Sequence, residues 1–194
     1  MPQLRTEEEL EQYIFDSFGS DFDWGWFEGD VLLRQFCISG YGVADLVKVS
    51  VAPGYNGRKN IPELNITVME LKKDEVKLDA VGQICRYRTG ISRALDKMRN
   101  RNGNILFTYE IEGILIGKEY DSGDVCYVVD NTDWLSTYTF DISLSDGISF
   151  SSDAGWYSTK EKDSVVVNSE IFKEFKSMLR YCVKANRKEA KVNV

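Results

Sequence analysis

One segment of the sequence, residues 79–99, does most to constrain how this chain folds. Its apolar residues recur at spacings near three and four, which is the pattern of an amphipathic helix with one buried face. These residues are Val81, Ile84, Ile91, Leu95 and Met98. Strand-like segments precede the helix at 66–71 and follow it at 105–117. A long helix between strands predicts an α/β fold, in which Gly90 is a weak point of the helix.

The rest of the chain predicts further elements around this unit. Thr6 and Glu9 have the spacing of a capping box, so a first helix is expected near residues 7–18. A density of Pro, Gly and Asn makes residues 52–63 an irregular loop. The other expected strands, of which the first two form a hairpin about Gly40, are 31–39, 41–51, 125–130 and 137–143.

Length and composition predict a single domain. The chain has 194 residues, of which 43% are hydrophobic, enough for one substantial core. We expect that core in about residues 1–120, with additional strands and a basic C-terminal helix, capped by Ser169, in 121–194. No stretch approaches the roughly 18 apolar residues of a membrane span, and the N-terminus is acidic. A cytoplasmic protein without membrane contact is the corresponding expectation.

The residue types in the sequence limit the catalytic chemistry that this chain can carry out. The chain has no histidine, which excludes histidine-based triads, imidazole bases and histidine metal ligands. Its four cysteines lie far apart without a CxxC pair, so reduced thiols are expected. The net charge is −7, yet residues 84–101 hold six Lys or Arg and one acid, and residues 170–194 hold seven and three. Two basic segments on an acidic body suit either a local phosphate-binding surface or solvated helix faces.

Polar residues interrupt the strands and the long helix at a few positions. Asp45 lies in one strand, and the triplet Glu70-Leu71-Lys72 ends another. Strand alternation turns Leu71 inward and sets Glu70 and Lys72 on one face. Two carboxylates, Asp45 and Glu70, supply the hard oxygen ligands that suit Mg²⁺ or Mn²⁺, and the Leu71 carbonyl is placed to add a third.

The following helix adds two polar patterns to these strands. Gln83 and Tyr87 stand four residues apart on the border of its buried face. Arg86, Arg93 and Lys97 share a stripe on the opposite side.

The run Glu70–Tyr87, ELKKDEVKLDAVGQICRY, preceded by Gly42–Asp45, resembles the PD-(D/E)xK nuclease superfamily. The resemblance is to the branch with a QxxxY helix motif, and most to the archaeal and actinobacterial mismatch endonuclease family. It covers roughly residues 31–117 and implies a restriction-endonuclease-like α/β core, a mixed central β-sheet flanked by helices. The interval from Asp45 to Glu70 is longer than the family pattern.

The resemblance implies a Mg²⁺- or Mn²⁺-dependent nuclease that cuts DNA internally. Asp45 and Glu70, with the Leu71 carbonyl, would bind the metal, and Lys72 would be the catalytic lysine. Gln83 and Tyr87 would support the site, and Glu11, or else Glu7, would match the acid of the first helix. The phosphate contacts would come from the basic residues Arg86, Arg88, Arg93, Lys97, Arg99 and Arg101. Many relatives dimerise, so a homodimer stays open.

Simpler interpretations stand beside this one. Glu70 and Lys72 alone would form a surface ion pair worth about 0–1 kcal/mol. Asp45 alone would be a turn or strand-end residue, Gln83 a surface residue, and Tyr87 an ordinary core-edge aromatic. Trp24, Trp26 and Phe27 suit core packing or a partner surface better than base stacking because acidic residues surround them. The acidic body also favours a second hypothesis, an inactive nuclease-fold module that binds nucleic acid or a protein.

Overall fold

The computed structural model describes residues 6–18, 30–56, 59–101, 107–143, 147–152 and 190–192. Its helices are α1 (Glu7–Asp16), α2 (Leu78–Arg101) and α3 (Asp124–Asp130). Its strands are β1 (Val31–Ile38), β2 (Gly42–Asn56), β3 (Lys59–Leu71), β4 (Glu75–Val76), β5 (Thr108–Gly117), β6 (Glu119–Tyr120), β7 (Leu135–Ser143), β8 (Gly147–Ser152) and β9 (Ala190–Val192). The expected C-terminal helix and the aromatic turn with Trp24, Trp26 and Phe27 lie outside the described residues.

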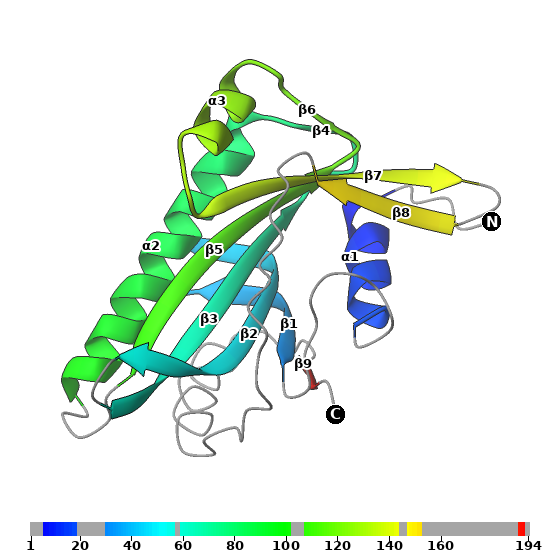
Figure 1. The fold of residues 1–194 in the computed structure, drawn as a ribbon. Coiled ribbons are helices and arrows are strands. Elements are labelled where there is room, and N and C mark those ends of the chain that lie inside the picture. The colour runs from blue at the N-terminus through cyan, green and yellow to red at the C-terminus, as the bar shows by residue number, and fades with distance from the viewer. Residues whose placement is uncertain are drawn as a thin grey trace.

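Seven strands form one mixed sheet in the order β8-β7-β5-β3-β2-β1-β9 (Figure 1). β1, β2 and β3 follow one another as antiparallel neighbours, and α2 then carries the chain to β5, which lies parallel to β3. β7 continues the parallel part, and β8 and β9 close the two edges with antiparallel pairing. The strands β4 and β6 pair separately beside it. The expected α/β fold with a mixed central sheet is confirmed.

Helices cover both faces of the sheet. The apolar side of α2 packs on one face, where Ile91 and Leu95 join the buried side chains of β1, β2 and β3. α1 packs on the other face through Leu10, Ile14 and Phe15 (Figure 1). Among the described residues, no helix has the length and apolar character needed to cross a membrane.

The first helix begins as the sequence predicts. The Thr6 hydroxyl accepts from the N–H of Glu9 at 3.1 Å, and the Glu9 carboxylate accepts from the N–H of Thr6 at 3.3 Å. This capping box satisfies two of the N–H groups that a helix start leaves without partners. It fixes where α1 begins, and so which of its acids face the sheet.

The loop expected at 52–63 is wrong, because the ladder between β2 and β3 continues to Asn56 opposite Lys59. Pro53 and Pro62 face each other in that ladder. The N–H of Lys72 donates to the Ile116 carbonyl at 2.7 Å, so alternate N–H groups of β3, at even-numbered positions, point toward β5. An N–H group at position 62 would therefore point away from β2. Because proline lacks only this outward N–H, the proline pair costs the hairpin no hydrogen bond.

The strand expected at 125–130 is also wrong, because these residues form α3. Valine favours strands, but Val125, Val128 and Val129 are spaced three and four apart and meet the cluster around Ile84 from one helical side. Asp124 lies in the first turn, where a negative charge stabilises a helix. Tertiary packing therefore outweighs local preference here.

Gly90 does not interrupt α2. A Cβ atom at this position would lie 2.5 Å from a methyl carbon of Ile38 and 2.6 Å from the ring of Tyr41. The helix and the turn between β1 and β2 approach each other at this residue because glycine has no side chain. The expected weak point is a packing contact.

Candidate active site

Asp45 and Glu70 come from neighbouring antiparallel strands. The pairing of β2 with β3 runs to Leu46 opposite Met69, and one further step in the same register sets Asp45 opposite Glu70. The direction of the N–H groups in β3 makes this a position without mutual ladder hydrogen bonds. Facing side chains lie closest at such positions. The register therefore brings together two acids that are far apart in the sequence.

The Glu70 side chain is buried, and among the described residues Lys72 alone donates a hydrogen bond to it. Its side chain is 3% exposed, and its Oε1 accepts from the Lys72 ammonium at 2.8 Å. Strand alternation thus sets Glu70 and Lys72 on one face, as expected, with Leu71 fully buried between them. Among the described residues, nothing donates to Glu70 Oε2, which is also buried. A buried carboxylate oxygen without a donor is a group that a cation would satisfy.

Asp45 is held by the end of β3. Its Oδ2 accepts from the N–H of Leu71 at 2.8 Å, and its Oδ1 accepts from the Gln35 amide at 3.5 Å. The Leu71 hydrogen bond uses the backbone group that follows Glu70 in the chain. It therefore fixes the Asp45 carboxylate beside Glu70.

The electrostatics of this pair favour protonation in the metal-free protein. Burial raises the pKa of Glu70 to about 7, and the nearby charge of Asp45 adds to the effect. Burial likewise raises the pKa of Asp45 to about 6, against the hydrogen bond from Leu71. Two carboxylates that resist ionising together gain most from a cation placed between them.

Lys72 remains positively charged. Burial by itself lowers the pKa of the Lys72 ammonium, but the hydrogen bond and charge of Glu70 outweigh this, and the pKa is raised above its ordinary value. The ammonium is therefore a fixed positive charge at the edge of the acid pair.

Gln83 and Tyr87 lie on the side of α2 that faces these strands. Tyr87 is 3% exposed, and the Gln83 amide donates to its hydroxyl at 3.5 Å. Burial and the charge of Glu70 raise the pKa of the Tyr87 hydroxyl, which places this group near the acid pair. Gly42, at φ +125°, lies against the ring, with 2.8 Å between the position of a Cβ and Tyr87 Cε1. The helix pair thus borders the site.

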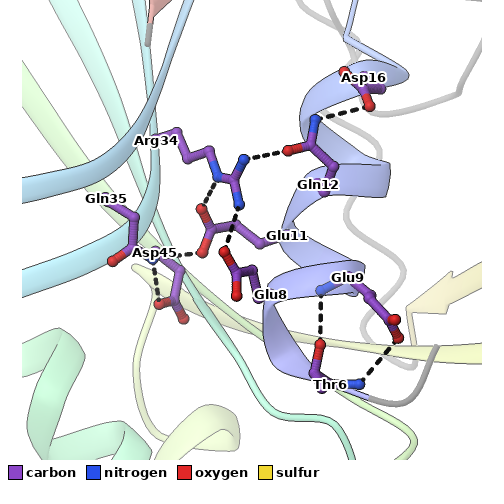
Figure 2. A network of polar contacts seen from close by, with 9 residues as sticks. All are labelled: Thr6, Glu8, Glu9, Glu11, Gln12, Asp16, Arg34, Gln35 and Asp45. Carbon is purple, nitrogen blue, oxygen red and sulfur yellow. Dashed lines mark hydrogen bonds and ion pairs between the residues drawn. The ribbon is translucent and has the colours of Figure 1, made fainter. Parts of the chain in front are cut away.

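The acids Glu11 and Glu7 of α1 relate to the site in different ways, and Figure 2 shows the contacts of Glu11. Both oxygens of Glu11 are engaged, because Oε1 accepts from Arg34 and Oε2 from Gln35. Glu7 is exposed, and its negative charge contributes to the raised pKa values of Asp45 and Glu70. Of the two acids, Glu7 is the more open. Direct metal binding by either, or by the Leu71 carbonyl, stays a prediction.

Sequence reasoning missed Arg34 and Gln35. Arg34 is nearly buried, forms an ion pair with Glu11, and also donates to Gln12 of α1 (Figure 2). The available signal was two adjacent polar residues within VLLRQFCI, a strand that is otherwise apolar. Polar residues inside a buried strand need partners, so they mark a polar network on the neighbouring element.

The basic stripe of α2 is exposed as expected. Arg86, Arg93 and Lys97 all face solvent. The Arg93 guanidinium donates to the Tyr41 hydroxyl at 2.6 Å, which ties the stripe to the turn between β1 and β2. Arg88 donates to the Ile111 carbonyl at 3.1 Å. The side chains of Arg99 and Arg101 lie outside the described part of the structure.

The site offers a cation two acids and not a complete cage. Within the described ranges, no three His, Cys, Asp or Glu side chains form a preassembled metal cluster. Mg²⁺ is commonly bound through one or two carboxylates and keeps several waters, so binding of Mg²⁺ by Asp45 and Glu70 stays a prediction that needs no third acid.

No protein-family model and no curated protein matches this chain. Two solved structures do. A repair endonuclease from Pyrococcus abyssi matches with 21% identity and a TM-score of 0.41, over 71% of this chain and 47% of that one. A complex of EndoMS with dsDNA matches with 20% identity and a TM-score of 0.39, over 70% of this chain and 45% of that one. The chain thus spans under half the length of either protein.

Proposed function

We propose that this protein is a metal-dependent nuclease that hydrolyses phosphodiester bonds in DNA, cutting within the strand. The observation that carries the proposal is the buried Glu70 carboxylate beside Asp45, with one oxygen on Lys72 and the other without a donor among the described residues. A surface ion pair would leave both oxygens in water. This arrangement instead keeps a buried carboxyl oxygen without a described donor next to the Lys72 ammonium.

The residues fit a Mg²⁺ or Mn²⁺ ion. Asp45 and Glu70 would hold it, with the Leu71 carbonyl as a further ligand. A bound ion of this kind supplies Lewis-acid chemistry, by polarising a phosphate oxygen and lowering the pKa of water.

The chain's own residues complete the proposed reaction. Lys72, protonated and 2.8 Å from Glu70, stabilises negative charge that develops on the phosphate and helps to orient the attacking water. Its hydrogen bond to Glu70 fits Lys72 as a cation and donor in this step. Gln83 and Tyr87 of α2 form the side of the site opposite the strands. Arg86, Arg93 and Lys97 bind backbone phosphates, which gives affinity without reading the base sequence.

The chain contains its own control for this proposal. Glu75 and Lys77 repeat the Glu-x-Lys spacing, with 3.3 Å between the ammonium and the carboxylate, but their side chains are 39% and 66% exposed. Glu75→Gln and Lys77→Ala therefore remove the same chemical groups from a surface pair.

The test is cleavage of supercoiled plasmid and of short single- and double-stranded DNA, with Mg²⁺, with Mn²⁺ and with EDTA. We expect Glu70→Gln and Lys72→Ala to lose about a hundredfold or more in rate, and the Glu75 and Lys77 variants to cut like the wild type. If the wild type leaves every substrate intact with both metals, the nuclease proposal fails. The alternative of an inactive nucleic-acid-binding or protein-binding module then remains.

A further inference from the structure

The β1–β2 ladder is interrupted at one position beside the site. Pairing is continuous on both sides, but Gln35 and Asp45 are missing from it. On both β1 and β2, the two residues that flank the interruption and belong to the same core cluster are three positions apart. Regular strand alternation would place them two positions apart. These residues are Leu33 and Phe36 on β1, and Ala44 and Val47 on β2. Both strands therefore change face at the same place.

Gln35 makes this change through an unfavourable backbone conformation. Its φ is +49°, and within the described chain it is the one residue other than glycine with a positive φ. Glycine adopts this conformation freely, and asparagine and aspartate do so more readily than other residues. A glutamine at such a position indicates that its side chain has a role that glycine does not supply.

That side chain connects two acids. The Gln35 amide nitrogen donates to Glu11 Oε2 and, at 3.5 Å, to Asp45 Oδ1 (Figure 2). Arg34 holds the other oxygen of Glu11, so Glu11 is a fixed anchor for the amide. The Leu71 N–H holds Asp45 from the opposite side. Asp45 is thereby oriented by one donor on each of its oxygens.

We propose that Gln35 is a positioning residue that orients the Asp45 carboxylate for divalent cation binding, with Glu11 and Arg34 as its support. This inference rests on the proposed function, because it assigns Asp45 to a metal ion. Loss of a group that orients a metal ligand typically weakens metal binding by 10- to 100-fold. A residue that served only to turn the strand would be replaced by glycine without any such loss.

The experiment measures Mn²⁺ affinity, by isothermal titration calorimetry and by the electron paramagnetic resonance signal of free Mn²⁺, beside thermal unfolding in EDTA. Gln35→Gly keeps the backbone conformation accessible and removes the amide. Gln35→Asn also tolerates the backbone, but its side chain is one methylene group shorter. Gln12→Ala is the matched control, because Gln12 accepts from the same Arg34 and, within the described structure, forms no hydrogen bond with Asp45.

We expect Gln35→Gly and Gln35→Asn to raise the Kd for Mn²⁺ about tenfold or more, with unfolding midpoints within a few degrees of the wild type. Gln12→Ala should bind Mn²⁺ like the wild type. Wild-type affinity in Gln35→Gly, or equal weakening in Gln12→Ala, would overturn the role of Gln35 and leave the nuclease proposal intact. Failure of both Gln35 variants to fold would assign Gln35 a structural role instead. Failure of the wild type to bind Mn²⁺ would overturn the proposed function and this inference together.

Discussion

Glu70 and Glu75 each begin a Glu-x-Lys triplet, but the surroundings of the two triplets differ. Glu70 lies at the end of a central strand, buried beside Asp45, whereas Glu75 lies in a short strand at the surface. Burial raises the pKa of Glu70, and no described residue donates a hydrogen bond to its Oε2. The chemistry of the triplet therefore depends on where the fold places it.

The raised pKa values predict how the stability of the metal-free protein depends on pH. Folding raises the pKa of Glu70 from 4.5 to about 7, so between these values the folded state binds more protons than the unfolded state. The stability from this group is then fully present below the unfolded pKa and is lost as pH rises through the folded one. We expect the unfolding midpoint in EDTA to fall by several degrees across this range, and Glu70→Gln to flatten the fall.

The measurement is thermal unfolding from pH 4.5 to 8 in wild type and Glu70→Gln, with Glu75→Gln as the control. Adding Mn²⁺ at the upper end should restore stability to the wild type because a cation favours the ionised acids. A wild-type midpoint that differs from that of Glu70→Gln by the same amount at every pH would contradict this account.

At the scale of elements, the position of α2 depends on Gly90, a residue without a side chain. Gly90 lets the helix lie against Ile38 and Tyr41, and Tyr41 in turn accepts from Arg93 of the stripe. The contact fixes the distance between α2 and the β1–β2 turn. The same helix carries Gln83 and Tyr87 to the acid pair, so this packing also sets the helix side of the site.

Two glycines of α2 give a matched test. Gly82 has open space where a Cβ would lie, and Gly90 does not. Gly82→Ala should stabilise the protein by about 0.5–1 kcal/mol because alanine favours the helix. Gly90→Ala should destabilise it by about 1–3 kcal/mol because the added methyl group overpacks the contact. Urea unfolding of both variants measures this, and stabilisation by Gly90→Ala would show that the packing is not tight.

Much of the element structure was predictable because it depends on local patterns. The capping box at Thr6, the buried face of α2 and the alternation around Leu71 all follow from spacing along the chain. The hairpin through 52–63 and the helix α3 were not predictable, because strand partners and tertiary packing decided them against local preference.

The candidate site follows the same division. Asp45, Glu70 and Lys72 were recognisable as residue types in sequence, and the fold brings them together. Gln35 was not, because its role depends on a break in the ladder and on an acid from a distant helix. The two polar residues within VLLRQFCI indicated a polar network, but not the backbone conformation that the two strands impose on each other at Gln35.

At the scale of the whole molecule, the proposed binding of DNA by a chain of net charge −7 requires a local basic surface. Arg86, Arg93 and Lys97 supply it if they contact phosphates as proposed. Each phosphate contact on duplex DNA contributes about 0.9 to the slope of log K against log salt. Replacing all three by alanine should lower the slope by roughly 2 to 3 and weaken binding similarly for all sequences.

Fluorescence anisotropy with duplex DNA in EDTA, across a series of salt concentrations, measures that slope without cleavage. Lys118→Ala is the control, because Lys118 is exposed and lies outside α2. An unchanged slope in the triple variant would place the DNA surface elsewhere on the molecule.

The outer part of the β2–β3 hairpin has a consequence for how copies of this protein behave at high concentration. In the described structure, β2 has no pairing with β1 beyond Val49, and β5 pairs with β3 only from Glu63. The outer arm of the hairpin, residues 50–56 and 59–62, therefore has pairing only between its own two strands. Both of its flanks would accept an incoming strand from another molecule. Pro53 and Pro62 each remove an outward donor there, and proline at an edge discourages such pairing. The arm can therefore project from the body with less risk of self-association into aggregates.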